Sequence, residues 1–395
     1  MQPIAEQIEN AYGVANYEVV TISLVYMGFF IVFNFPSNYV IDKYGIRVGV
    51  VAGILFTLVG QYLKCLINLE GGFSILIFGQ MIAAVGQPFL ANAPTKVAQQ
   101  WYSEEGRVIA TTIGAAANPL GVACGFVLPA LFVGDKDTLP ENKVHAREDI
   151  FYSLLLQAGL TTVVAILVLI SFREKPPTPP SASCEVEKTE FRKSLPLLLK
   201  NKNALLLANI FGFIMGVFNA LGSVAAIMAK SAHYDAAYSP VLGAVFIIGG
   251  MIGSALFGIW VEKTKRYKLA TILICVLSTI MMGLLIVSFA IRSVGFTAGM
   301  CLCIGLVMIP IMPVGFDFVL ELTFPVGEAM STGLLFSMGQ LWGIVFTVMT
   351  TGLVTDYDFN GTLISGGVMM ICCGVAAALS FFMKEDLRRK KMEQQ

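Results

Sequence analysis

Long runs of apolar residues recur along almost the whole chain, and they constrain its fold more than any other feature. A helix needs roughly 20 apolar residues to cross about 30 Å of hydrocarbon. Dividing the chain where charges, glycines or prolines interrupt such runs gives eleven segments: 18–41, 46–68, 72–100, 106–133, 148–172, 204–230, 237–262, 267–291, 294–321, 326–353 and 362–383. We therefore predict an all-α polytopic membrane protein with about 11 transmembrane helices.

The composition agrees with a membrane protein and argues against other classes. Hydrophobic residues make up 56% of the 395 residues and charged residues only 13%, which is more apolar surface than a soluble core buries. The sequence has no basic block, so we expect a lipid bilayer and no nucleic acid as its partner. It also has no catalytic triad, metal-ligand motif or phosphate loop, so we expect no enzyme and no metal or cofactor.

Lysine and arginine are unevenly divided between alternate loops. One set of loops carries 20 of the 26 basic residues, and loops rich in these residues stay in the cytoplasm. We therefore expect a cytoplasmic C-terminus and an N-terminus outside. The sequon at Asn360 then lies in an outer loop, where it is a candidate for glycosylation. The plasma membrane is the default location and an organelle membrane the alternative, because no targeting signal is recognisable.

A segment rich in proline and charge separates five apolar segments from six. We predict an N-terminal bundle over 1–172, a cytoplasmic linker over 173–203, a C-terminal six-helix bundle over 204–383 and a basic tail over 384–395. The loop around Glu262 follows a second-half segment much as residues 42–47 follow a first-half segment. Repeated halves of this kind are typical of transporters.

Several motifs resemble those of a known transporter family. Asp42, Gly45 and Arg47 resemble the loop signature of the major facilitator superfamily. Further matches at 3–5, 87–102, 118–121, 315–325 and 331–340 resemble the FLVCR-type branch, the feline leukaemia virus subgroup C receptor-like transporters. The resemblance implies the major facilitator fold of two pseudo-symmetric helix bundles, alternating access, and a small solute such as choline or ethanolamine.

The resemblance also leaves alternatives open. In the family the loop signature follows helix two, so the first bundle here is expected to lack helix one. A partner helix filling that position would suit a transport-inactive receptor or an accessory subunit of a membrane complex, and an upstream start codon would restore the helix. Haem export is less favoured than choline-like transport, because the two histidines, His145 and His233, both lie in predicted outer loops.

Amides inside apolar segments need partners, so each is either an interhelical contact or part of a polar cavity. These amides are Asn34, Gln61, Gln80, Gln87, Asn92, Asn118, Asn209, Asn219 and Gln340. The resemblance implies that Gln87 and Gln340 contact the substrate, and it adds Asn118 as a weaker candidate. Asn219 aligns with a family tyrosine, which favours a substrate with more hydrogen-bonding groups. Aromatic faces attract organic cations, and the candidates of this kind are Tyr26, Phe89 and Trp342.

Charged residues around the first loop are candidates for a gate. Gly45 permits a tight turn there. Asp42 can form ion pairs with Arg47 or with Lys96, and such pairs break and re-form as two halves of a transporter move. The alternative is that these basic residues only set the topology.

The second half supplies further gating candidates. Asp317 and Glu321 lie four residues apart, on one helix face near the inner end of their segment, and Glu262 lies in the loop that resembles the first. No apolar segment carries a carboxylate near its middle. Proton coupling usually needs such a group, so facilitated diffusion is favoured over symport.

Overall fold

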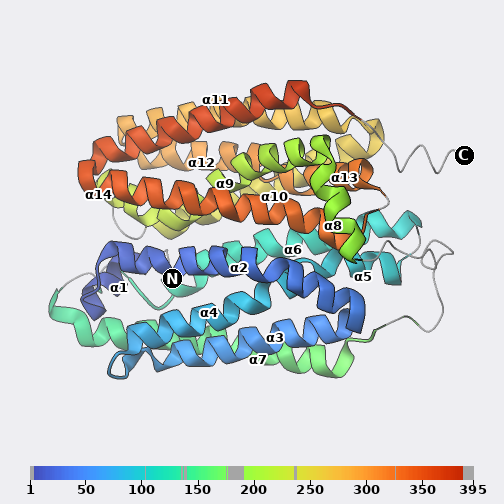
Figure 1. Cartoon of the computed structure of the whole chain (residues 1–395). Coiled ribbons are helices and arrows are strands. Elements are labelled where there is room, and N and C mark those ends of the chain that lie inside the picture. The colour runs from blue at the N-terminus through green and yellow to red at the C-terminus, as the bar shows by residue number, and fades with distance from the viewer. Residues whose placement is uncertain are drawn as a thin grey trace, which may run out of the picture.

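The structure is a computed structural model that describes residues 4–102, 104–134, 137, 140–174, 176, 191–234, 238–324 and 326–385. Parts of the expected linker (177–190) and tail (386–395) lie outside these residues. The described residues form helices and turns and contain no strand. Figure 1 shows two stacked groups of long, nearly parallel helices.

The first group is built from the N-terminal half. A short helix, α1 (Ala5–Tyr12), precedes five long ones: α2 (Asn16–Tyr44), α3 (Ile46–Lys64), α4 (Gly72–Ala91), α6 (Glu104–Ala130) and α7 (Lys143–Ser171). Another short helix, α5 (Ala93–Trp101), almost continues α4. The two separate at Asn92, and Pro94 lies in the first turn of α5, where a missing backbone N–H does no harm.

The second group is built from the C-terminal half. The short helix α8 (Phe191–Lys200) leads into α9 (Lys202–Ser231), α10 (Tyr238–Thr264), α11 (Tyr267–Ile291), α12 (Val294–Met308), α13 (Ile311–Thr323) and α14 (Glu328–Phe382). The segment expected at 294–321 is divided into α12 and α13. The division falls at Ile309 and Pro310, because proline lacks a backbone N–H and disfavours helix in the residue before it.

Helix α14 covers two of the expected spans. Its 55 residues would measure about 80 Å as one straight helix, more than twice the hydrocarbon thickness. Non-helical angles at Asp358 (φ 50°, ψ −124°) bend it inside the expected loop, so the chain turns back there. With α14 counted once, nine described helices are long and apolar enough to span a membrane, and α6 adds the shorter apolar stretch Ala117–Ala130. Each of the eleven predicted segments therefore corresponds to a helix, a helix pair or one arm of α14.

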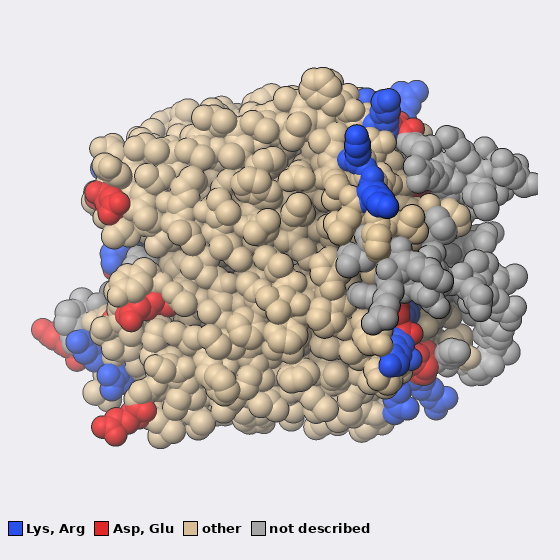
Figure 2. All heavy atoms as spheres, in the orientation of Figure 1, with Lys and Arg blue, Asp and Glu red and all other residues tan. Residues whose placement is uncertain are grey.

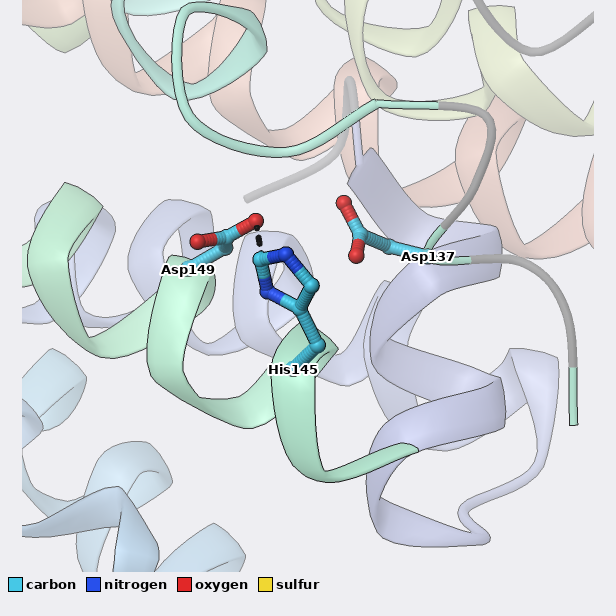
Figure 3. A group of neighbouring side chains, drawn as sticks. All are labelled: Asp137, His145 and Asp149. Carbon is cyan, nitrogen blue, oxygen red and sulfur yellow. Dashed lines mark ion pairs between the residues drawn. The ribbon is translucent and has the colours of Figure 1, made fainter. Parts of the chain in front are cut away.

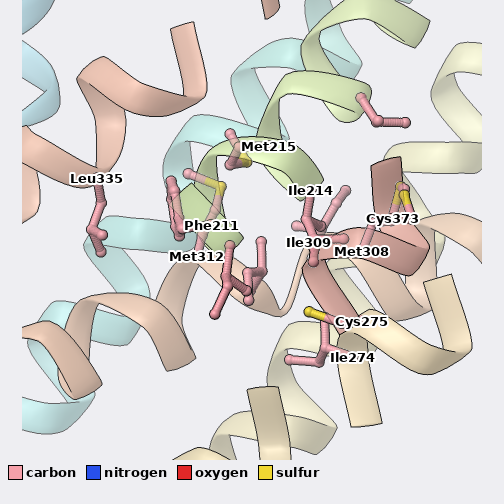
Figure 4. Close-up of a cluster of buried hydrophobic side chains, with 14 of the residues drawn as sticks. Phe211, Ile214, Met215, Ile274, Cys275, Met308, Ile309, Met312, Leu335 and Cys373 are labelled. Atoms are coloured by element: carbon pink, nitrogen blue, oxygen red, sulfur yellow. The ribbon is translucent and has the colours of Figure 1, made fainter. Parts of the chain in front are cut away.

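The two halves bury their side chains differently. One cluster joins all the long helices of the C-terminal half, α9 to α14, and also includes Val20 and Phe30 of α2; its members include Phe211, Ile274, Met308 and Cys373 (Figure 4). The N-terminal half instead has two smaller clusters. One packs Ile8 of α1 and Ile4, which directly precedes α1, against α2, α4 and α7, and the other surrounds Ile46 at the opposite end. Polar side chains of α2 and α4 lie between these two clusters along the bundle.

The two ends of the bundle differ from its middle. We call the end that carries α5 and α8 the α8 end, and the end that carries α1 the α1 end (Figure 1). On the face that Figure 2 draws, charged side chains gather at both ends and the band between them is uncharged. Such a band suits the hydrocarbon of a bilayer, in which helices satisfy their backbone groups internally.

Candidate functional site

The middle of the molecule contains an amide pair in the C-terminal half. Asn219 of α9 lies with its Nδ2 3.4 Å from Gln340 Oε1 of α14 and 3.4 Å from the Gly339 carbonyl oxygen. Gln340 is buried, at 8% exposure, and Asn219 is half-buried. Both distances are long for N–H···O bonds, so the Asn219 amide is held weakly and can exchange these partners for a ligand.

Helix α2 of the N-terminal half packs beside the amide pair, next to Gly343 of α14. A Cβ atom built on Gly343 would lie 3.0 Å from Asn219 Cβ and 3.3 Å from Met27 Sδ. Glycine at this position therefore allows α2, α9 and α14 to meet beside the amide pair. Tyr26 precedes Met27 on α2 and is half-buried.

Gln87 supplies an amide from the N-terminal half. Its side chain is half-buried on α4, and its Oε1 is buried with no hydrogen-bond partner among the described residues. An unpaired buried carbonyl costs about 1–3 kcal/mol, so this oxygen is available to a donor that the chain does not supply.

The remaining predicted binding residues do not gather at the amide pair. Phe89 lies about half a helical turn from Gln87 and packs in the apolar cluster with Ile46 and Val50. Trp342 packs against Phe213, with ring centroids 4.4 Å apart, and its buried Nε1 has no partner among the described residues. Asn118 is exposed on α6. Packing of Phe89 and Trp342 within their own halves explains why two aromatic residues near the amides in sequence do not face them.

Sequence reasoning missed an aromatic layer between the amide pair and the α8 end. Phe30 of α2 lies 5.8 Å from Phe336 of α14, measured between ring centroids. Phe336 lies 4.9 Å from Phe316 of α13, which lies 5.7 Å from Phe211 of α9. All four rings are buried, so they join the two halves through a dry contact. Phe30 follows Tyr26 by one helical turn and Phe211 lies near an amide in the sequence, but nothing in the sequence indicated that the four rings meet.

An asparagine network lies beyond this layer, closer to the α8 end. Asn34 Nδ2 donates to the Gly333 carbonyl at 2.7 Å and to Ser337 Oγ at 2.8 Å, while Asn34 Oδ1 accepts from Asn92 Nδ2 at 2.8 Å. Asn38 Nδ2 donates to the Ala329 carbonyl at 3.1 Å. The three asparagines are buried. The interhelical role considered for Asn34 and Asn92 is thereby confirmed, and the network fastens α2 and α4 to α14.

The loop between α2 and α3 contains one of the two ion pairs considered for Asp42. Lys96 of α5 pairs with the Asp42 carboxylate and also donates to the Ile41 carbonyl at 3.3 Å. Gly45 has φ 95°, which favours glycine. Arg47 donates its backbone N–H to the Glu174 carboxylate.

Glu174, which sequence reasoning missed, caps the start of α3. Its two carboxylate oxygens accept from the backbone N–H groups of Ile46 at 3.0 Å and Arg47 at 2.8 Å. A carboxylate at a helix N-terminus satisfies orphan donors and complements the helix dipole. A Cβ on Gly45 would lie 2.4 Å from Glu174 Oε1, so this contact also requires glycine at position 45.

The other predicted charges lie away from the amide pair. Asp317 is exposed and Glu321 half-buried on α13, and Glu262 is exposed at the end of α10. Asn360 is exposed beside the bend of α14. His233 is exposed just after α9 and His145 is exposed in the first turn of α7, so neither reaches the middle of a span.

A second contact between the halves lies at the α1 end. Lys230, near the end of α9, has its Nζ 3.1 Å from Glu6 Oε1 and 4.0 Å from Glu9 Oε2 of α1. Burial raises the pKa of Glu9 and the nearby Lys230 lowers it, with burial the larger effect. The halves are thus joined at both ends, with the amide pair between the two contacts.

Comparison with known proteins identifies the family. The Major Facilitator Superfamily model matches residues 2–347. The choline/ethanolamine transporter flvcr2b of Danio rerio is 31% identical over 97% of this chain and 79% of its own length. Choline/ethanolamine transporter FLVCR2 of Homo sapiens is 30% identical over 96% of this chain and 72% of its own length.

Solved structures agree on the fold. A bacterial homologue of the human lysosomal transporter Spinster matches with TM-score 0.70 at 15% identity, over 98% of this chain and 93% of its own. The E. coli fucose:proton symporter FucP matches with TM-score 0.62 at 16% identity, over 97% and 96%. The chain belongs to the major facilitator superfamily, and within it to the FLVCR-type transporters.

Proposed function

We propose that this protein carries a small amino alcohol of the choline and ethanolamine class across a membrane, with Asn219, Gln340 and Gln87 as its main substrate contacts. The observation that carries the proposal is the weakly held Asn219–Gln340 pair, beside which helices of both halves meet at Gly343. The two relatives named above are choline/ethanolamine transporters, which supports this substrate class.

Within that class we propose a preference for ethanolamine over choline. Amide oxygens of Gln87 and Gln340 accept hydrogen bonds from an ammonium N–H or a hydroxyl. A quaternary ammonium offers no N–H and depends on aromatic faces. Trp342 already stacks on Phe213 and Phe346, and Phe89 packs in an apolar cluster, which leaves Tyr26 as the aromatic candidate. Asn118 stays a secondary candidate on α6.

We further propose that transport is facilitative and proceeds by alternating access between two halves divided at residues 173–203. The carboxylates of α13, Asp317 and Glu321, follow Phe316 of the aromatic layer along this helix toward the α8 end. By the positive-inside rule the α8 end faces the cytoplasm. Asp42, Gly45, Arg47 and Lys96 then act at the inner gate with Glu262, and Asn360 lies outside.

Uptake of labelled ethanolamine and choline into proteoliposomes tests the proposal. We expect Asn219→Ala, Gln340→Ala and Gln87→Ala each to reduce ethanolamine uptake at least about tenfold, equivalent to about 1.4 kcal/mol. Asn209→Ala is the matched control, because the Asn209 amide donates to the Leu205 carbonyl of its own helix. No uptake of either solute by folded wild-type protein would favour the transport-inactive receptor or subunit. Equal uptake by all variants would remove the amides from the site.

A further inference from the structure

Three side chains at the α1 end form a compact group that the proposed transport path does not use. Asp137 precedes α7 in the segment after α6, and His145 and Asp149 lie on the first two turns of α7. One ligand atom from each residue lies within 4.8 Å of the others. Figure 3 shows the His145 ring between the two carboxylates, with its Nδ1 3.2 Å from Asp149 Oδ2.

Asp137 is the unusual member of this group, because it is fully buried, at 0% exposure. Its Oδ2 accepts from the Gly134 backbone N–H at 2.8 Å. Its Oδ1 is buried and has no hydrogen-bond partner among the described residues. Burying a carboxylate without a compensating charge is costly, and Figure 3 shows this carboxylate facing His145. A cation bound between the three side chains would compensate that charge.

The ligand types select the cation. One imidazole nitrogen with carboxylate oxygens suits zinc or manganese, whereas calcium takes six to eight oxygen ligands. Zinc bonds to nitrogen and oxygen measure about 2.0–2.2 Å, so tetrahedral ligand atoms lie roughly 3.4 Å apart. The three ligand atoms, within 4.8 Å of one another, would have to move closer to reach that separation. Solvent could supply the fourth ligand, because His145 is exposed.

We propose that Asp137, His145 and Asp149 form a binding site for a divalent transition-metal ion at the α1 end. The sequence did not reveal it, because the spacing matches no zinc motif and Asp137 is brought to α7 only by the fold. The Asp137 carbonyl accepts from Asn10 Nδ2 of α1 at 3.0 Å. Arg147 of α7 donates to the Ala11 carbonyl at 2.9 Å. A metal ion here therefore stiffens the support of α1, the helix that contacts Lys230 of the other half.

Titration of the purified, detergent-solubilised full-length protein with Zn²⁺ tests the site, with Mn²⁺ electron paramagnetic resonance as the second readout. We expect one ion per chain and a Tm that rises with Zn²⁺, since ligand binding to the folded state stabilises it. His145→Gln and Asp137→Asn should each weaken binding at least about tenfold. His145→Gln keeps the test valid if Asp137→Asn does not fold, because His145 is exposed.

Matched controls separate this site from adventitious metal binding. Glu148→Gln removes an exposed carboxylate beside Asp149. His233→Asn removes the other histidine at a position with φ 60°, which asparagine tolerates. Both controls should bind Zn²⁺ like the wild type. Wild-type protein that binds neither ion, or binding that survives His145→Gln, would overturn the proposal. Neither result affects the uptake assay, so the failure of one proposal is distinguishable from that of the other.

Discussion

Two of the contacts that join the halves, one at each end of the bundle, have opposite physical character. At the α8 end, Asn34, Asn38 and Asn92 are at most 1% exposed and bond to backbone and side-chain groups of their neighbours. At the α1 end, the side chain of Lys230 is 53% exposed and those of Glu6 and Glu9 are 35% and 21% exposed. Three helices, α2, α4 and α14, and an aromatic layer form the first contact, whereas the short helix α1 and one lysine of α9 form the second.

This difference indicates which end opens more easily. Exposed ion pairs contribute about 0–1 kcal/mol and are screened by salt. Separating a buried amide network leaves several donors and acceptors without partners, at about 1–3 kcal/mol each until water reaches them. Alternating access requires each contact to open in turn. We therefore expect the α1 end to open more often than the α8 end in the absence of substrate.

The largest expected effect comes from removing Asn34, which joins α2, α4 and α14. Asn34→Ala removes its hydrogen bonds to the Gly333 carbonyl, Ser337 and Asn92, so we expect the free energy of unfolding to fall by on the order of 2–4 kcal/mol. Thermal unfolding in detergent measures this. A cysteine introduced at Ala329 should also react faster with a water-soluble thiol reagent, because the α8 end opens. If Asn209→Ala destabilises the protein equally, the network has no special role in closure.

A smaller effect is expected from substituting Gly333, whose carbonyl accepts a hydrogen bond from Asn34. A Cβ on Gly333 would lie 2.9 Å from the Nδ2 atoms of both Asn34 and Asn38. Gly333→Ala therefore displaces both amides, and we expect a loss of about 1–3 kcal/mol. Gly352→Ala on the same helix is the control, because nothing lies within 4 Å of its added Cβ. Equal Tm values for the two variants would show that the α8 contact is loosely packed.

The smallest effect is expected at the α1 end. Lys230→Gln should lower stability by less than about 1 kcal/mol, and salt at about 0.5 M should erase the difference. The raised pKa of Glu9 gives this contact a pH dependence. Acidification protonates Glu9 before an ordinary glutamate and removes its ion pair, so the effect of Lys230→Gln should shrink as the pH falls toward the ordinary pKa of glutamate. Because burial raises the pKa of Glu9 in the folded protein, this carboxyl stabilises the fold below the ordinary pKa of glutamate. That stabilisation is lost as the pH rises through the raised pKa. A larger, salt-insensitive effect would make the two ends alike.

The spans were predictable because lipid leaves the backbone few options. Apolar length and helical hydrogen bonding together determine where a chain crosses a bilayer, and each predicted segment has its counterpart. The helices differ from the predicted segments at two positions. A break at Pro310 separates α12 from α13, and non-helical angles at Asp358 lie inside α14. The family followed from short motifs, which the comparisons confirm.

The candidate site was less predictable, because the sequence does not distinguish an amide that binds substrate from one that bonds to a neighbouring helix. Asn34 and Asn219 belong to the same residue type and to similar apolar segments. Asn34 is fully buried and makes short bonds, whereas Asn219 is half-buried with two long ones. Gln87 and Phe89 are two positions apart, which turns them to nearly opposite faces of α4.

The sequence by itself determined the membrane class, the helical spans, the family and the uneven distribution of basic loops, since each depends on local composition and short motifs. Only the tertiary structure decided which amides are satisfied, how each end is closed, and that Asp137 meets His145 and Asp149. Those properties depend on contacts between residues as far apart as Asn34 and Gly333, 299 positions along the chain. Burial and hydrogen-bond geometry come into being only when the helices pack.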